Sequence, residues 1–182
     1  MNQSTNSSTM IIFADAATSP QTGVAVGAFL CFGKEYISEY AECSIERLSA
    51  KLATEIVYIE LKSKKSTWSE IRTVIDALNF ARRNTVSGCT IQIYTDCQSL
   101  CDLLGKRKEK LKSSNYTTRT GKLLNNATLY QELFEVADKV TIQTCKIKGH
   151  RLISQRTTWQ DRIFSLLDKF SRKKLRWLLN HE

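Results

Sequence analysis

TIQIYTDCQSLCDL, residues Thr90–Leu103, passes directly from a strand pattern to a helix pattern. Its first half, from Ile91 to Tyr94, carries the β-branched and aromatic residues that are typical of strands. Asp96 follows at the point where the strand pattern stops and a polar, helix-starting segment begins. The stretch therefore predicts a strand that delivers a carboxylate to one edge of a sheet.

Other carboxylates lie in comparable settings along the chain. Asp15 follows an apolar run, Glu70 opens an amphipathic helix, and Asp168 or Asp161 lies on a basic helix near the C-terminus. Carboxylates gathered from strand ends and helices would hold hard divalent cations through oxygen.

Each of the first three carboxylates also has a structural alternative. Asp96 fits a helix N-cap, Glu70 fits a capping box with Thr67, and Asp15 fits the start of a turn. Against the last alternative, the alternation of Ile11, Phe13 and Asp15 places these three side chains on one side of their strand. The sequence around each residue therefore leaves both roles open, metal ligand or cap and turn residue.

Length and composition indicate one globular domain. The chain has 182 residues, of which 42% are hydrophobic, and one proline. Such a length suits a single core, so we expect a disordered polar tail over residues 1–9 and one domain over residues 10–182. The net charge of +9 favours a polyanionic partner, either nucleic acid or an anionic membrane surface, over a merely basic protein.

The sequence contains no signal for a membrane or an oxidising compartment. No apolar run approaches the ~20 residues of a membrane span, and the polar N-terminus does not resemble a signal peptide. The six cysteines form no CxxC pair and there are two histidines, which argues against a zinc site. We therefore expect a cytoplasmic protein with reduced thiols and no membrane contact.

Hydrophobic periodicity predicts a mixed α/β order. The short connection after the first strand implies an antiparallel hairpin, and strands joined through helices are expected to be parallel. Residues 35–43 fit a further strand, residues 44–51 fit a short helix, and the role of the insertion around residues 34–52 stays open. The predicted strands are 10–17, 24–32, 54–61, 89–95 and 140–147, and the predicted helices are 67–83, 97–104, 127–137 and 158–179.

These motifs, in this order, resemble ribonuclease H type 1 over about residues 10–178. The matching segments are Asp15 in FADAA, Glu70 in STWSEIRTVIDAL, Asp96 in YTDCQSL, Lys148-Gly149-His150 and Asp168 in LLDKFSRKKLR. The resemblance implies a five-stranded mixed sheet of the RNase H-like fold, with strands 1–3 antiparallel and strands 1, 4 and 5 parallel, flanked by helices.

The resemblance also implies an activity and a site. It implies an endonuclease that hydrolyses the RNA strand of an RNA–DNA hybrid with two Mg²⁺ ions, or Mn²⁺ in their place. Asp15, Glu70, Asp96 and Asp168 would be the metal ligands, and His150 would assist proton transfer or product departure.

The fourth ligand has two candidates. The sequence around LLDKFSRKKLR favours Asp168, whereas spacing from His150 favours Asp161, which lies seven residues earlier on the same helical face. The chain also departs from the family pattern after Asp15, where Ala16-Ala17 replaces the usual Gly-Ser.

A basic run after the fourth strand's helix is the predicted nucleic-acid contact. The partner would be an RNA–DNA hybrid recognised by shape and 2′-OH groups, and we expect a monomer. The alternatives are another nuclease or a strand transferase on the same fold, or a non-catalytic nucleic-acid-binding module, which the altered Ala16-Ala17 motif favours. The run comprises Lys106, Arg107, Lys108, Lys110 and Lys112.

Overall fold

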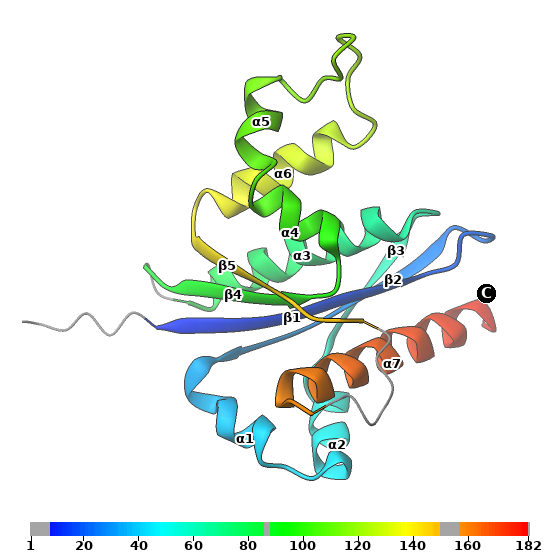
Figure 1. The fold of residues 1–182 in the computed structure, drawn as a ribbon. Helices are drawn as coiled ribbons and strands as arrows, with labels where there is room; N and C mark the ends of the chain where they lie inside the picture. The colour runs from blue at the N-terminus through cyan, green and yellow to red at the C-terminus, as the bar shows by residue number, and fades with distance from the viewer. Residues whose placement is uncertain (1–7, 86–87, 150–156, 182) are drawn as a thin grey trace, which may run out of the picture.

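A computed structural model of the protein describes residues 8–85, 88–149 and 157–181. The elements follow one another in the order in which Figure 1 colours them. They are β1 (Thr9–Thr18), β2 (Val24–Gly33), η1 (Lys34–Tyr36), α1 (Ile37–Ala41), α2 (Ile45–Glu55), β3 (Val57–Lys62), α3 (Ser66–Arg83), β4 (Thr90–Thr95), α4 (Gln98–Leu104), α5 (Lys108–Ser113), α6 (Ala127–Ala137), β5 (Thr141–Lys146) and α7 (Trp159–Leu179).

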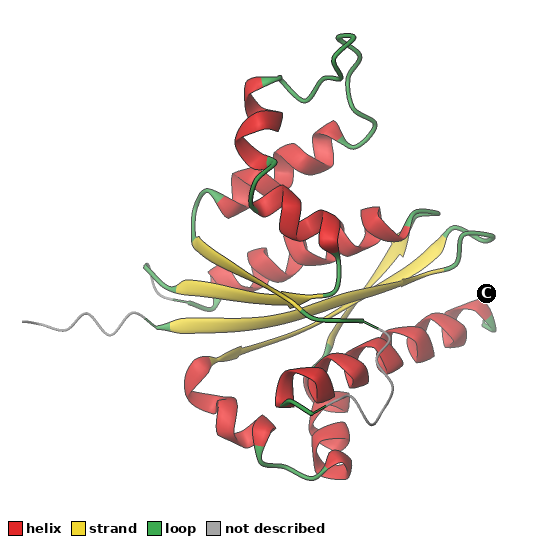
Figure 2. Ribbon diagram, viewed as in Figure 1, coloured by secondary structure: helices red, strands yellow, loops and turns green. Residues whose placement is uncertain are grey.

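The five strands form one mixed sheet in the order β3-β2-β1-β4-β5 (Figure 2). β1 pairs with β2 and β2 pairs with β3 in antiparallel register. β1 pairs with β4 and β4 pairs with β5 in parallel register. The predicted RNase H-like sheet is therefore confirmed: β1, β2 and β3 are antiparallel neighbours, although helices join β2 to β3, and β1, β4 and β5 are parallel neighbours.

Helices cover both faces of this sheet (Figure 1). Side chains of β1 alternate between two cores: Ile12 and Ala14 pack on the side of α3 and α6, whereas Ile11 and Phe13 pack on the side of α7. This alternation is the two-residue period of a strand that is buried on both faces. β1 is thus fixed at the centre of the molecule, with a helical layer on either side.

The segment between β2 and β3 differs from the sequence-based expectation. Residues 35–41 are helical and residues 42 and 43 form a bend, so the strand predicted over residues 35–43 is not present. The predicted strand 54–61 begins later, at Val57, because α2 continues through Glu55. Leu48 and Leu52, one helical turn apart, are both fully buried. Burial of this i, i+4 pair outweighs the strand preference of the β-branched residues that follow, so the chain stays helical through Glu55.

This helical insertion packs beside α7. Tyr40, Leu48 and Leu52 join the core that contains Ile163 and Leu167 of α7. Arg162 of α7 donates hydrogen bonds to the backbone carbonyls of Ala41 and Cys43. The insertion around residues 34–52 therefore braces the helix that carries Asp168.

The remaining predicted elements agree with the structure to within a few residues at their ends. Thr9, predicted to belong to the tail, is the first residue of β1, while residues 1–7 lie outside the described part. Within the described ranges, no helix combines the length and the apolar character needed to cross a bilayer.

Candidate active site

The register between β1 and β4 brings two carboxylates to the same level of the sheet. Phe13 is the partner of Tyr94 in the parallel ladder. Asp15 lies two residues after Phe13, and Asp96 lies two residues after Tyr94. Because parallel strands end at the same edge, the two carboxylates lie side by side at the carboxyl end of β4.

Asp15 points toward α7, on the face predicted from its alternation with Ile11 and Phe13. It is 8% exposed, and its Oδ2 accepts a hydrogen bond of 3.0 Å from the Ser171 hydroxyl of α7. Burial, and then the charges of Asp168 and Asp96, raise the pKa of Asp15 to about 7. Asp15 is therefore close enough to Asp168 and Asp96 for their charges to disfavour its ionised form, in addition to the effect of burial.

Glu70 reaches the same region from α3, on the other face of the sheet. Burial raises the pKa of Glu70 and the charge of Asp96 raises it further, whereas a hydrogen bond from the Cys97 thiol lowers it. The same burial and bond raise the pKa of Cys97 to about 12, so this thiol stays protonated and can donate. Glu70 is therefore electrostatically linked to Asp96 and, through it, to Asp15.

Neither Asp96 nor Glu70 has the helix-capping role that the sequence left open as an alternative. Cys97, rather than Asp96, is the N-cap of α4, and its sulfur accepts from the Leu100 amide at 3.3 Å. α3 begins at Ser66, and its N-cap, Lys65, makes no side-chain capping bond. Glu70 therefore lies beyond the first turn and is not part of a capping box with Thr67.

Gly149 passes directly over Asp96. A Cβ atom at this position would overlap Asp96 Oδ2, so a side chain here would displace the carboxylate. The connection from β5 thus approaches Asp96 closely because residue 149 is a glycine. His150, the predicted proton-transfer residue, lies outside the described residues.

The two candidates for the fourth carboxylate differ in environment. Asp161 is buried and forms a capping box with Thr158 at the start of α7: the Thr158 hydroxyl accepts from the Asp161 amide and the Asp161 carboxylate accepts from the Thr158 amide. Asp168 lies two turns later, close enough to raise the pKa of Asp15, and its Oδ1 accepts from Arg172 Nε at 2.6 Å. The structure thus brings Asp168 to Asp15 and places Asp161 in a helix cap.

The donor set suits a hard divalent cation. It consists of carboxylate oxygens from β1, the end of β4, α3 and α7, and the mutual repulsion of three of them would be relieved by a bound cation. As the side chains stand, no group of three or more His, Cys, Asp or Glu residues in the described ranges is arranged as a metal site. The Asp168 carboxylate is 34% exposed, and Arg172 holds it through Oδ1.

The predicted basic contact lies on α5 and the turn before it. Lys108 and Lys112 both pair with Asp138, each at 2.5 Å, and Lys106 pairs with Asp102 at 3.2 Å. Arg107 and Lys110 are exposed, and neither forms an ion pair with any residue that the structure describes. The free positive charge of the run is thus concentrated on these two residues.

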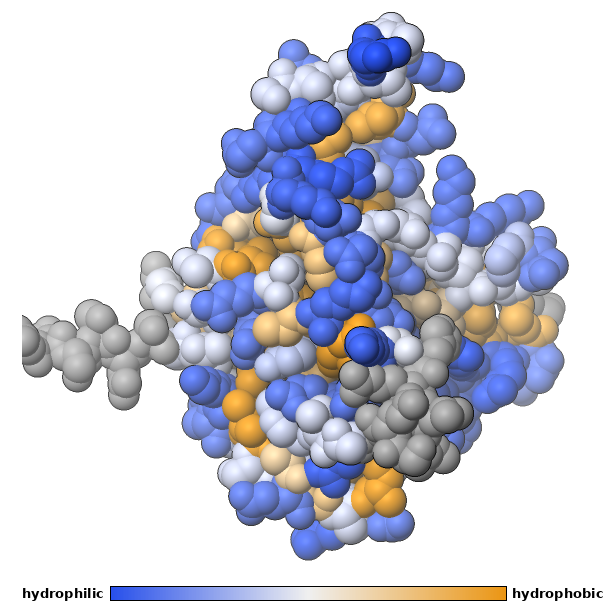
Figure 3. All heavy atoms as spheres, in the orientation of Figure 1, coloured by the Kyte–Doolittle hydropathy of each residue, from blue (hydrophilic) through white to orange (hydrophobic). Residues whose placement is uncertain are grey.

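The loop that follows α5 extends the basic surface. Arg119 and Lys122 are exposed on it, and the space-filling view shows mostly hydrophilic surface over this end of the molecule (Figure 3). These two residues give no signal in the sequence, because they are isolated within a polar segment rather than part of a run.

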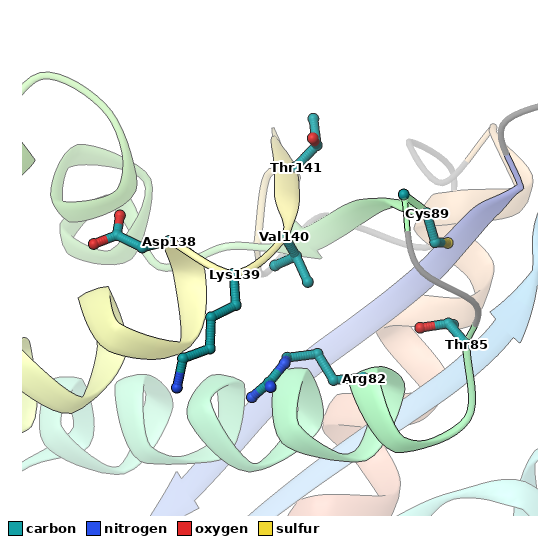
Figure 4. A pocket seen from close by; sticks show the side chains of 8 residues that line it. Arg82, Thr85, Cys89, Asp138, Lys139, Val140 and Thr141 are labelled. Atoms are coloured by element: carbon teal, nitrogen blue, oxygen red, sulfur yellow. The ribbon is translucent and has the colours of Figure 1, made fainter.

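A separate pocket opens at the other end of the sheet. Its lining comes from the end of α3 and from the segments that precede β4 and β5, including Arg82, Cys89 and Lys139. Figure 4 shows Arg82 and Lys139 extending toward the same space, while Asp138 points away from it. Because Asp96 follows β4 and this pocket precedes it, the pocket is distinct from the carboxylate site.

The fold and the placement of these carboxylates define an α/β protein of the RNase H-like class. The chain belongs to the RNase H family, because the family model described as RNase H matches residues 7–163. The matched range includes Asp15, Glu70, Asp96 and Asp161 and ends before Asp168. No curated protein matches the chain significantly.

Solved structures share this fold at low sequence identity. The PFV RNase H domain has 16% identity and a TM-score of 0.61, over 93% of this chain and 94% of that one. LC9-RNase H1, a type 1 RNase H with the type 2 active-site motif, has 13% identity and a TM-score of 0.63, over 91% and 71%. The foamy viral protease-reverse transcriptase in complex with RNA/DNA hybrid has 12% identity and a TM-score of 0.55, over 92% of this chain and 20% of that one.

Two contacts of the site could not be read from the sequence. Ser171 and Cys97 each hydrogen-bond a carboxylate from a distant part of the chain. A serine on a helix and a cysteine after a strand carry no local signal of such a role, because the partner is supplied by tertiary packing.

Proposed function

We propose that this chain is a metal-dependent endonuclease that hydrolyses the RNA strand of RNA–DNA hybrids. The observation that carries the proposal is the convergence of Asp15, Asp96 and Asp168: burial, and then the charges of Asp168 and Asp96, raise the pKa of Asp15 to about 7. Family membership supports the nuclease class, and the foamy viral enzyme of similar fold has been solved with an RNA/DNA hybrid.

Four carboxylates would hold the metal ions: Asp15, Asp96 and Asp168, with Glu70 from the opposite face. Divalent cations, when bound, would supply activation of the attacking water and stabilisation of the leaving oxygen. Asp15 lies in β1 and Asp96 directly follows β4, so they would fix the position of the scissile phosphate, while the absence of a side chain at Gly149 leaves the Asp96 carboxylate in place. His150 stays a predicted proton-transfer residue.

The basic surface would hold the hybrid. Arg107 and Lys110, which are exposed and form no ion pair within the described structure although the charge of Arg107 also acts on Asp102, would contact phosphates, and Arg119 and Lys122 would extend this contact. Phosphate contacts fix position without reading sequence, which suits an enzyme that recognises the shape and 2′-OH groups of its substrate.

A substrate panel tests the proposal. The protein is incubated with an RNA–DNA hybrid, a DNA duplex or an RNA duplex, with Mg²⁺, Mn²⁺ or EDTA. We expect metal-dependent cleavage of the RNA strand in the hybrid. Asp96→Asn should lower the cleavage rate by more than about 100-fold, because loss of a ligand should exceed the effect of losing a residue that merely orients one.

Asp76→Asn is the matched control. It alters a half-buried aspartate on α3 that is coupled to Arg72 and Glu132 instead of to the site, and it should retain wild-type cleavage. Cleavage of the DNA duplex but not of the hybrid would favour another nuclease on this fold. Hybrid binding without any cleavage would identify a non-catalytic binding module.

A further inference from the structure

Ser171 is a fully buried serine on α7, one helical turn after Asp168. Its Oγ lies 3.0 Å from Asp15 Oδ2 and 3.0 Å from the Asp168 backbone carbonyl oxygen. The hydroxyl therefore connects the central strand to the helix that carries the fourth carboxylate.

A hydroxyl has one hydrogen, so it can donate to one of these two acceptors at a time. The bond to the Asp168 carbonyl is a local i−3 contact that a buried helical serine commonly makes. The bond to Asp15 is different, because it spans 156 residues of sequence and engages a buried carboxylate. Donation to an ionised acceptor is the stronger of the two bonds.

Two neighbouring residues of α7, Ser171 and Arg172, each donate a hydrogen bond to a carboxylate. Residues 168, 171 and 172 are three and four positions apart and so share one face of the helix. Arg172 donates to Asp168 Oδ1 while Ser171 donates to Asp15 Oδ2. One turn of α7 thus holds one oxygen of each of two carboxylates, and Asp15 accepts a further hydrogen bond from the backbone of Ala16.

We propose that Ser171 is a positioning residue for divalent-cation binding: its hydroxyl fixes the rotation of the Asp15 carboxylate so that Oδ1 is presented to the cation. This inference rests on the proposed function, and it adds a residue that touches neither the cation nor the substrate. Groups that orient carboxylate ligands in this way contribute about 10–100-fold to metal affinity.

The test is a metal titration that does not depend on catalysis. The thermal unfolding midpoint of the full chain is followed as Mn²⁺ or Mg²⁺ is added, because a cation that binds the folded state raises this midpoint. Ser171→Ala should increase the cation concentration needed for half of the stabilisation by about tenfold. The cleavage reaction should show the same shift in metal dependence, with KM for the hybrid unchanged.

Ser69→Ala is the matched control. Ser69 is equally buried and its hydroxyl contacts Thr18 and the Lys65 carbonyl, with no carboxylate among these partners. It should lower stability without moving the metal midpoint. If Ser171→Ala does not fold, Ser171→Cys replaces the hydroxyl with a weak thiol donor and should shift the midpoint in the same direction.

The outcomes separate this inference from the proposed function. A wild-type protein that is stabilised by the cation and cuts the hybrid, with an unchanged midpoint in the folded Ser171 variant, would overturn the role of Ser171 alone. A wild-type protein that neither cation stabilises would overturn metal-dependent cleavage and the role of Ser171 with it.

Discussion

Asp15 is a carboxyl group that the fold keeps partly protonated near neutral pH. Burial and two neighbouring carboxylates raise its pKa to about 7, from an ordinary value of 3.8. Between these two values the folded protein binds a proton that the unfolded chain has released. The favourable contribution of Asp15 is therefore complete below pH 3.8 and is lost as the pH rises through about 7.

We accordingly predict that, in EDTA, the free energy of unfolding decreases as the pH rises from about 4 to about 7. Asp15→Asn removes the titrating group, so it should flatten this dependence and stabilise the protein at pH 7 by on the order of 2 kcal/mol. Denaturant unfolding at several pH values measures both effects. Asp102→Asn, which alters a partly buried aspartate of α4 that pairs with Lys106, should keep the wild-type slope, and an equally steep slope in Asp15→Asn would contradict the prediction.

At the scale of elements, α7 carries two aspartates in different environments, one in the helix cap and one near the candidate site. Asp161 completes the capping box with Thr158, whereas Asp168 lies two turns further along and is electrostatically coupled to Asp15. The insertion between β2 and β3 holds the first part of α7 through Arg162. The two aspartates therefore lie on one helix but have different contacts: Asp161 caps its start, and Asp168 is near Asp15.

Substitution of each aspartate should therefore have opposite consequences. Asp161→Asn should destabilise the protein by about 1 kcal/mol, as loss of a cap does, and leave hybrid cleavage within a few-fold of wild type. Asp168→Asn should lower cleavage by more than about 100-fold with little change in unfolding. Thermal unfolding and single-turnover cleavage distinguish the two, and a severe loss of cleavage in Asp161→Asn alone would exchange their roles.

At the scale of the whole molecule, charge is distributed unevenly. The chain carries +9 overall, yet Lys106, Lys108 and Lys112 are partly neutralised by neighbouring aspartates. Attraction between exposed cations and phosphates decreases with salt, because counterions are released when the two meet. Binding of the hybrid should thus weaken steeply as salt is added.

The double variant Arg107→Ala/Lys110→Ala should reduce the slope of log affinity against log salt by about two, one for each phosphate that a removed cation would have neutralised. Lys108→Ala/Lys112→Ala removes the same charge from residues already paired with Asp138, so its effect should be smaller. Fluorescence anisotropy with a labelled hybrid at several salt concentrations provides the measurement. Equal slopes in the two double variants would show that the ion pairs do not decide which cations bind.

Much of the fold was determined by the sequence alone. The alternation in β1, the apolar face of α3 and the turn after Thr18 specify strands and helices locally, and the short connection after β1 specifies that β1 and β2 run antiparallel. Two predictions among the described residues were wrong. The strand expected over residues 35–43 is replaced by η1 and α1. The strand expected from residue 54 begins at Val57, because burial of Leu48 and Leu52 against α7 outweighs local strand propensity and extends the helix through Glu55. Propensity is a weak preference that tertiary contacts can reverse.

The sequence alone indicated which residues are candidates for the site. Only the tertiary structure decided which of them lie close together. Carboxylates at strand ends marked Asp15 and Asp96, but the register of β1 against β4 placed them together. The sequence left Asp161 and Asp168 open, and packing of α7 brought Asp168 to Asp15 and put Asp161 in a cap. Ser171 became visible only in three dimensions, because a hydrogen bond depends on distance in space, and its two partners are 156 residues apart in the chain.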